Sequence, residues 1–265
     1  MESRERRLAF YREWFLSAIG KEPFDYQLDI LTRKDPVIVN KARQTGISTA
    51  FACKAVTKAA LGNLKVLICS KDQNASVHIL NDYCQDFLRP LIETGEIAKP
   101  ETDQKALLQW RKTGGEIRSF PARPEHVRGY AANYIIFDEA AHFTAEVGLG
   151  EKMLEAVAPA LSQVGGVMDM ASTPNGTASM FYRVWDTAPP ERKIAIPYTR
   201  CPTLKIKVEE LPFGKRYYIE GLPFAFPEDS FRQEFMNDFF VGSNEAIPRT
   251  ALYAALMNTD EGAWE

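Results

Sequence analysis

Short runs rich in apolar and β-branched residues alternate with longer amphipathic segments along most of the chain. The short runs lie at 36–39, 65–69, 134–137, 166–171 and 193–196, and segments with apolar residues at helical spacing lie at 4–18, 49–56 and 75–91. The short runs predict buried strands, and the longer segments predict helices. Because strands alternate with helices, the pattern predicts an α/β fold with a mainly parallel central sheet flanked by helices.

Two stretches depart from this alternation. Residues 106–110 and 116–120 flank Thr113-Gly114-Gly115, which predicts a β-hairpin. From about Pro202 the pattern loosens into segments interrupted by Pro and Gly, followed by expected helices around 227–240 and 249–257. We therefore expect a core at residues 1–201 that includes the N-terminal helix, and a small lid or linker subdomain at residues 202–265.

The loop between strand 36–39 and helix 49–56 has the character of a phosphate-binding loop. Gly46 allows the backbone to approach phosphates, the amides that open the helix face an anion, and the Ser48 hydroxyl suits Mg²⁺. The pattern G-x-x-x-x-G-K-[ST] is broken twice, because Lys41 replaces its first glycine and Ile47 replaces its lysine. The predicted ATP-binding loop consists of Lys41, Ala42, Arg43, Gln44, Thr45, Gly46, Ile47, Ser48 and Thr49.

The replaced lysine leaves the phosphates without their usual cation. Ile47 cannot neutralise phosphate charge, so Lys41 or Arg43 must reach in if this loop binds ATP. Lys41 is the better candidate, because it stands at the end of the strand and its side chain can turn back under the loop. The alternative is that both residues are surface cations and that Gly46 is an ordinary turn glycine.

Asp138 and Glu139 directly follow the strand at 134–137. One carboxylate, Asp138, is expected to hold Mg²⁺ through water, while Glu139 orients the water that attacks the γ-phosphate. Alone, such a pair is also typical of a solvated strand end. The phosphate loop and the acids both follow strands, and the carboxyl ends of parallel strands meet at one edge of a sheet. The sequence therefore predicts an ATP-hydrolysing site there, and the subdomain at residues 202–265 is expected to lie over its nucleotide cleft.

Two further motifs fit the same site. Ser172, Thr173 and Asn175 lie in Ser172-Thr173-Pro174-Asn175-Gly176, after the strand at 166–171, where small polar side chains can sense a γ-phosphate. Tyr26 and Gln27 precede the first strand, and an aromatic ring beside an amide suits the adenine base. The alternatives are an ordinary turn and a decorated surface helix, respectively.

Taken in order, these motifs resemble those of the large terminase subunit of tailed bacteriophages, the motor that packs DNA into a procapsid. The matching segments are Tyr26-Gln27, Arg43 to Thr49, Ile135 to Ala140 and Ser172 to Gly176. The resemblance implies an additional-strand P-loop ATPase that uses ATP and Mg²⁺, with these segments as adenine motif, Walker A loop, Walker B strand and coupling motif. A displaced Walker A lysine, as at Ile47, is frequent in that family.

The resemblance also implies partners. Arg128, in His126-Val127-Arg128-Gly129-Tyr130, matches an arginine that acts in trans on the ATP of a neighbouring subunit, although a surface ion pair is the simpler explanation. Double-stranded DNA, a portal protein, a small terminase subunit and a pentameric ring are implied, with monomers in isolation. A nuclease domain, which usually follows in this family, is expected to be absent, so we expect no DNA cleavage.

Composition changes this interpretation little. The chain has 265 residues, a net charge of -3 and four irregularly spaced cysteines, which indicate neither a zinc site nor a disulfide framework. No apolar stretch approaches the ~18 to 20 residues that span a bilayer, and the first residues lack a signal-peptide core, so we expect a protein of the host cytoplasm without a membrane partner. Candidate DNA-contacting cations are Arg111, Lys112, Arg118 and Arg123.

Two other functions remain compatible with the motifs. A helicase or remodelling ATPase would carry the same Walker elements together with a second domain of the same kind. A nucleotide-dependent scaffold without turnover would explain Ile47. Strand-displacement and turnover assays distinguish these alternatives from a packaging motor.

Overall fold

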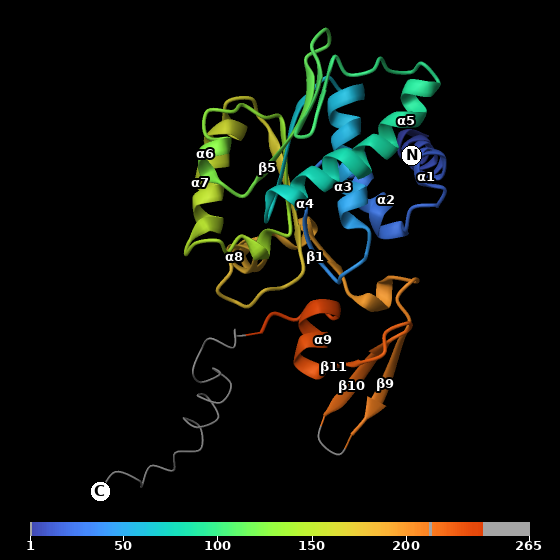
Figure 1. Cartoon of the computed structure of the whole chain (residues 1–265), viewed down its shortest axis with the longest axis vertical. Coiled ribbons are helices and arrows are strands. Elements are labelled where there is room, and N and C mark those ends of the chain that lie inside the picture. The colour runs from blue at the N-terminus through green and yellow to red at the C-terminus, as the bar shows by residue number, and fades with distance from the viewer. Residues whose placement is uncertain (1, 212–213, 241–265) are drawn as a thin grey trace, which may run out of the picture.

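The computed structural model describes residues 2–211 and 214–240 (Figure 1). Its helices are α1 (Glu2–Ile19), α2 (Asp25–Thr32), α3 (Ile47–Val56), α4 (Gln73–His78), α5 (Gln85–Glu93), α6 (Pro124–Val127), α7 (Leu149–Ser162), α8 (Met180–Thr187) and α9 (Glu228–Phe235). Shorter helical turns are η1 (Thr57–Leu61), η2 (Ile79–Cys84), η3 (Ala140–His142), η4 (Pro190–Arg192) and η5 (Tyr198–Arg200). The strands are β1 (Ile38–Lys41), β2 (Lys65–Ser70), β3 (Thr102–Gln104), β4 (Leu107–Trp110), β5 (Gly115–Pro121), β6 (Tyr134–Asp138), β7 (Val167–Ser172), β8 (Lys193–Ile196), β9 (Ile206–Glu210), β10 (Lys215–Ile219) and β11 (Ala225–Pro227).

A large mixed sheet forms the centre of the molecule. Within the described residues it has eight strands in the order β3-β4-β5-β2-β6-β7-β1-β8. Neighbours from β5 to β8 pair in parallel, whereas β3, β4 and β5 pair antiparallel. The predicted mainly parallel sheet and the predicted hairpin, formed by β4 and β5, are confirmed.

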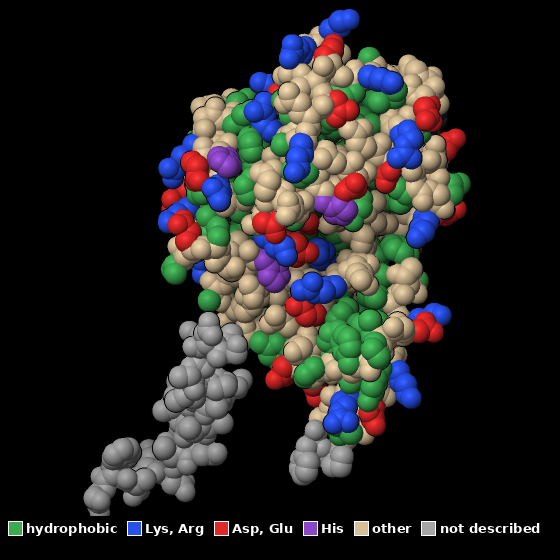
Figure 2. Space-filling model, viewed as in Figure 1, with side chains coloured by type: hydrophobic (Ala, Val, Ile, Leu, Met, Phe, Trp, Pro, Cys, Tyr) green, Lys and Arg blue, Asp and Glu red, His purple; other side chains and the backbone are tan. Residues whose placement is uncertain are grey.

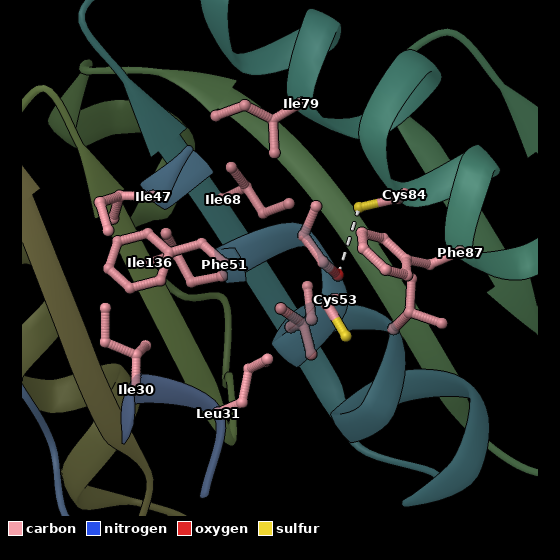
Figure 3. Packing of buried hydrophobic residues seen from close by; sticks show 14 of the residues in the cluster. Ile30, Leu31, Ile47, Phe51, Cys53, Ile68, Ile79, Cys84, Phe87 and Ile136 are labelled. Carbon is pink, nitrogen blue, oxygen red and sulfur yellow. Dashed lines mark hydrogen bonds between the residues drawn. The ribbon is translucent and has the colours of Figure 1, made fainter. Parts of the chain in front are cut away.

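Helices cover both faces of this sheet. Figure 1 shows α1 to α5 on one side and α6, α7 and α8 on the other. On the first side, Phe51, Ile68, Phe87 and Ile136 are fully buried in one apolar cluster (Figure 3). A second cluster lies between the sheet and α7 and α8. Burial of each large apolar side chain contributes about 1.5–3 kcal/mol, so the sheet is held rigidly between two packed layers.

The C-terminal part forms a separate small unit below the large sheet (Figure 1). Strands β9, β10 and β11 form an antiparallel sheet in the order β11-β10-β9, and α9 packs on it. The rings of Tyr217 and Phe231 stack with centroids 4.0 Å apart at an interplanar angle of 3°. The sequence pattern predicted a subdomain here but not its strands.

Two helices were expected in the C-terminal part of the chain, and one of them falls within the described residues. The helix expected at 227–240 is shorter, because α9 ends at Phe235 and Asn237 has a left-handed backbone with φ of 66°. The helix expected at 249–257 lies outside the described residues. In the described part of the chain, no helix combines the length and the apolar character that crossing a bilayer requires.

Candidate nucleotide-hydrolysis site

The phosphate loop is the turn between β1 and α3. Gln44 and Gly46 both have left-handed backbones, with φ of 58° and 71°, and α3 begins at Ile47. A Cβ on Gly46 would lie 2.7 Å from Gln27 Nε2, so position 46 requires glycine for its conformation and also for space. The free amides at the start of α3 point out of the helix end, as an anion site requires.

Tyr26 and Gln27, the predicted adenine motif, are both buried against this loop. The Tyr26 hydroxyl donates to the Thr45 carbonyl at 2.9 Å, and Gln27 Nε2 donates to the Gly46 carbonyl at 2.7 Å. Gln27 Oε1 accepts from the Phe24 amide at 2.9 Å. The structure thus assigns both residues a loop-holding contact, and recognition of adenine by them stays a prediction.

The rest of the loop is held from within the fold. The Ala42 amide donates to the Ile196 carbonyl at 2.8 Å, and Thr45 Oγ1 donates to the Ala42 carbonyl at 3.0 Å. Ile47 is 1% exposed and belongs to the apolar cluster on the α3 side, where Figure 3 shows it beside Phe51. The residue that replaces the Walker A lysine is therefore part of the core.

Lys41 and Arg43 point in different directions. Lys41 Nζ lies 2.6 Å from Glu139 Oε1, and the Lys41 side chain is 7% exposed. The Arg43 guanidinium pairs with the Glu234 carboxylate on α9 and is 56% exposed. Of the two candidate cations, Lys41 is the one directed toward the acids at the end of β6.

Ser48 and Asp138 meet across the sheet edge. Ser48 Oγ donates to Asp138 Oδ2 at 3.0 Å, and Asp138 Oδ1 is buried with no hydrogen-bond partner among the described residues. Burial, reinforced by the charge of Glu139, raises the pKa of Asp138. A hydroxyl and an uncompensated carboxylate oxygen are hard donors of the kind that Mg²⁺ takes, so these residues fit that ion.

Glu139 occupies a strained position beside them. Its backbone is left-handed, with φ of 55°, which is uncommon for a residue other than glycine and is frequent at functional sites. Burial acts to raise the pKa of Glu139, but Lys41, His142 and the Thr173 amide outweigh burial and lower it. These contacts therefore favour the ionised carboxylate.

The coupling motif reaches the same carboxylate. The Ser172 hydroxyl and the Thr173 amide each lie 3.4 Å from Glu139 Oε2. Ser172 Oγ also accepts from the Ala141 amide at 3.1 Å, and Asn175 Nδ2 donates to the Ala141 carbonyl at 3.1 Å. The turn after β7 is thus hydrogen-bonded to the turn after β6.

His142 also belongs to the site, although its motif did not predict this. Its Nε2 lies 3.0 Å from Thr173 Oγ1 and 4.0 Å from Glu139 Oε2. Burial lowers the pKa of His142, although Glu139 opposes this effect. The available signal was its spacing, because His142 ends the one-turn helix η3 directly after Glu139 and so points back toward the acids.

The C-terminal subdomain, which the sequence placed over the nucleotide cleft, touches the loop through specific contacts that the sequence did not identify. The Arg43 amide donates to the Glu234 carbonyl at 3.0 Å. Asn40 and Asn237 form two reciprocal hydrogen bonds. The side-chain Nδ2 of each residue donates to the backbone carbonyl of the other residue at 2.9 Å. Figure 2 shows charged side chains of both signs and a histidine gathered where this subdomain meets the larger unit.

Arg128 is not part of this cluster. It follows α6, its side chain is exposed, and it has no side-chain hydrogen bond or ion pair within residues 2–211 and 214–240. Among the candidate DNA-contacting cations, Arg118 is engaged in an ion pair with Glu116 at 2.8 Å.

The strand order defines an additional-strand P-loop ATPase fold, because β7 separates the loop-bearing β1 from β6, which ends at Asp138. The chain has the fold of the ATPase domain of phage large terminases, which confirms the resemblance seen in its motifs. The large terminase ATPase domain of Thermus phage P74-26 matches with a TM-score of 0.61 at 19% identity, over 85% of this chain and 97% of that domain.

Two longer terminases match as well. The HK97 bacteriophage large terminase gives a TM-score of 0.56 at 14% identity, over 74% of this chain and 43% of that protein. The large terminase of another thermophilic bacteriophage gives 0.51 at 16% identity, over 69% of this chain and 47% of that protein. The chain therefore spans less than half the length of these two. No protein-family model and no curated protein matches the sequence.

Proposed function

We propose that this chain is a Mg²⁺-dependent ATP hydrolase, the motor domain of a phage large terminase that couples ATP hydrolysis to translocation of double-stranded DNA into a procapsid. The observation that carries the proposal is the meeting of the phosphate loop with the acids after β6. Ser48 contacts Asp138 at 3.0 Å, and Lys41 contacts Glu139 at 2.6 Å. The terminase fold supports the same conclusion.

ATP binds with its phosphates against the amides from Gly46 to Thr49. Ser48 and, through water, Asp138 are the residues that would hold Mg²⁺, and the ion would supply positive charge to the phosphates. Lys41 supplies the second positive charge. Its ammonium lies 2.6 Å from Glu139 Oε1, so the same side chain stands beside the acids and can neutralise phosphate charge next to Glu139.

Glu139 then orients the attacking water. It accepts the proton as the water oxygen bonds to the γ-phosphorus and the bond to the β,γ-bridging oxygen breaks. Ser172, Thr173 and Asn175 pass the loss of the γ-phosphate on to the neighbouring elements, because they are hydrogen-bonded to Glu139 and to the turn that follows it.

Arg128 completes the site of a neighbouring subunit. A guanidinium that acts in trans fits a head-to-tail arrangement of subunits, and such an arrangement forms a ring when the rotation between neighbours closes. The charge it adds to the transferring phosphoryl group is worth of order 10³ to 10⁵ in rate. Double-stranded DNA, a portal protein and a small terminase subunit are the partners that the terminase resemblance proposes.

Substitution of Glu139 by Gln tests the hydrolysis mechanism. Glu139→Gln removes the proton acceptor but keeps the size of the side chain, so we expect Mg-ATP binding with turnover reduced by at least about 10²-fold. Calorimetric titration and phosphate release measure the two quantities. Normal turnover in Glu139→Gln, or no heat from wild type with Mg-ATP, would overturn the assignment.

A further inference from the structure

Glu116 is a buried carboxylate that takes no part in the proposed site. It lies on β5, and its side chain is 4% exposed. Its Oε1 accepts hydrogen bonds from Arg118 Nε at 2.8 Å and from the Tyr130 hydroxyl, and its Oε2 accepts one from Gln109 Nε2 at 3.0 Å. A buried charge is costly unless donors compensate it, and here three side chains do so.

Tyr130 differs from the other two donors in its position along the chain. Gln109 and Arg118 belong to the β4–β5 hairpin that also carries Glu116, whereas Tyr130 lies in the segment between α6 and β6. The Arg118 guanidinium also lies over the Tyr130 ring, 4.9 Å from its centroid. The contacts of Tyr130 therefore fasten that segment to the sheet.

Arg128 lies in this segment between α6 and β6, and the residues on either side of it are held in place. On one side Val127 is fully buried, and on the other Tyr130 is held by Glu116. The Tyr130 amide donates to the Val127 carbonyl at 3.1 Å, which closes the turn, and Gly129 takes the left-handed backbone that the turn requires, with φ of 79°. Arg128 stands exposed between the two fixed ends, so the start of its long side chain has a defined direction.

We propose that Tyr130, held by Glu116, is a positioning residue that directs Arg128 into the nucleotide site of a neighbouring subunit. The proposal rests on the proposed function, in which Arg128 acts in trans. A misplacement of about 1 Å in a catalytic group costs up to about 10²-fold in rate. Tyr130→Phe removes only the hydroxyl, so the turnover of assembled subunits falls by roughly 10- to 100-fold.

Mixed assemblies separate this role from a structural one. A Tyr130→Phe subunit keeps an intact pocket, and a Glu139→Gln subunit keeps an intact Arg128 turn. Turnover is measured with DNA at concentrations where wild-type turnover rises with assembly. We expect Tyr130→Phe mixed with Glu139→Gln to exceed the sum of the two alone, as Arg128→Ala mixed with Glu139→Gln does, and Tyr130→Phe mixed with Arg128→Ala to show no recovery.

Three results would overturn the inference. Full turnover of Tyr130→Phe alone would show that the hydroxyl is not needed. Recovery for Arg128→Ala but not for Tyr130→Phe would place the defect in the subunit's own pocket or fold. Failure of Arg128→Ala itself to recover would remove the trans role of Arg128 from the proposed function, and the inference with it.

Two further variants control the experiment. Tyr218 on β10 donates a hydrogen bond from its hydroxyl to Glu209 on β9 at 2.6 Å. Tyr218→Phe removes the same chemical group as Tyr130→Phe but far from the Arg128 turn in sequence, so we expect wild-type turnover. Mg-ATP titration of isolated Tyr130→Phe verifies its fold. If that variant does not bind nucleotide, Glu116→Gln, which loses the charge that Arg118 and Tyr130 contact, takes the same mixing test with the same interpretation.

Discussion

Lys41 and Arg43 stand two positions apart and have different partners, which separates their expected contributions to ATP binding. Lys41 is buried beside Glu139, whereas Arg43 is bound to Glu234 on α9. A charge-assisted hydrogen bond is worth about 1.5–3 kcal/mol, so we expect Lys41→Ala to weaken Mg-ATP binding by roughly 10- to 100-fold. Arg43→Ala should change the affinity by less than about threefold, because its partner belongs to the protein. Calorimetry on both variants measures this, and a larger loss for Arg43→Ala would reverse the assignment.

Substitution of His142 tests whether the contact between the turns after β6 and β7 contributes to ATP turnover. His142→Ala removes the contact with Thr173 Oγ1, and a hydrogen bond of this kind contributes about 0.5–1.5 kcal/mol. We therefore expect kcat to fall roughly 2- to 12-fold while KM for ATP changes little. His142→Gln places an amide nitrogen near the position of Nε2 and should recover most of the loss. Steady-state phosphate release measures both constants, and an unchanged kcat in His142→Ala would exclude the role.

The sequence identified most side chains of the site, but it did not establish their partners. Lys41, Ser48, Asp138 and Glu139 were predicted because their motifs follow strands that end at one edge of the sheet. The sequence favoured Lys41 over Arg43 without excluding Arg43, because the partner of each side chain, Glu139 or Glu234, comes from a distant part of the chain. Partners are set by side-chain direction, and side-chain direction is set by tertiary packing.

At the scale of elements, a buried ion pair joins the phosphate-loop helix to the strand that carries the coupling motif. Lys54 Nζ on α3 lies 2.5 Å from Asp169 Oδ2 on β7, and both side chains are buried. Asp169 also accepts from the Tyr134 hydroxyl on β6 and from the Val37 amide at 2.9 Å. Four parts of the fold therefore meet at the end of the sheet opposite the site.

Removal of both charges should cost less stability than the sum of the costs of removing each charge alone. Lys54→Met leaves a buried carboxylate without its counter-ion, which costs about 3–5 kcal/mol in the free energy of unfolding. Adding Asp169→Asn removes that charge, so the double variant should be less destabilised than the sum of the two single variants. Urea unfolding of all three variants measures this. Additive losses would show that the two side chains do not interact.

The strands of the central sheet were predictable, and those of the C-terminal subdomain were not. Buried parallel strands such as β6 are continuous apolar runs, which a sequence shows plainly. In β9, by contrast, Ile206 is partly buried and the other residues are exposed, so charged residues dominate the segment and its pattern is weak. Short exposed strands of this kind are specified by their pairing with β10.

At the scale of the whole molecule, the C-terminal subdomain was expected over the nucleotide cleft, but the residues that join it to the phosphate loop could not be predicted. Asn40 and Asn237 are 197 residues apart in sequence and are joined only by tertiary structure. The same segment reaches the turn after the coupling motif, because the Thr177 amide donates to the Phe240 carbonyl at 3.1 Å. Residues 234–240 therefore contact both the phosphate loop and the segment that follows β7.

Asn237 provides a test of whether this contact transmits the nucleotide state. Asn237→Gly keeps the left-handed backbone, which glycine adopts without strain, but removes the bond to the Asn40 carbonyl. We expect Mg-ATP to change amide hydrogen exchange in β9 and β10 of wild type, and this change to be reduced in Asn237→Gly while the affinity for Mg-ATP stays within about threefold of wild type. Tyr218→Phe, which alters the same small sheet without touching the contact, should respond as wild type does. An identical exchange response in Asn237→Gly would show that the response does not need the bond from the Asn237 side chain to the Asn40 carbonyl, because that bond is the one contact the substitution removes while the Asn40 side chain keeps its bond to the backbone carbonyl of residue 237.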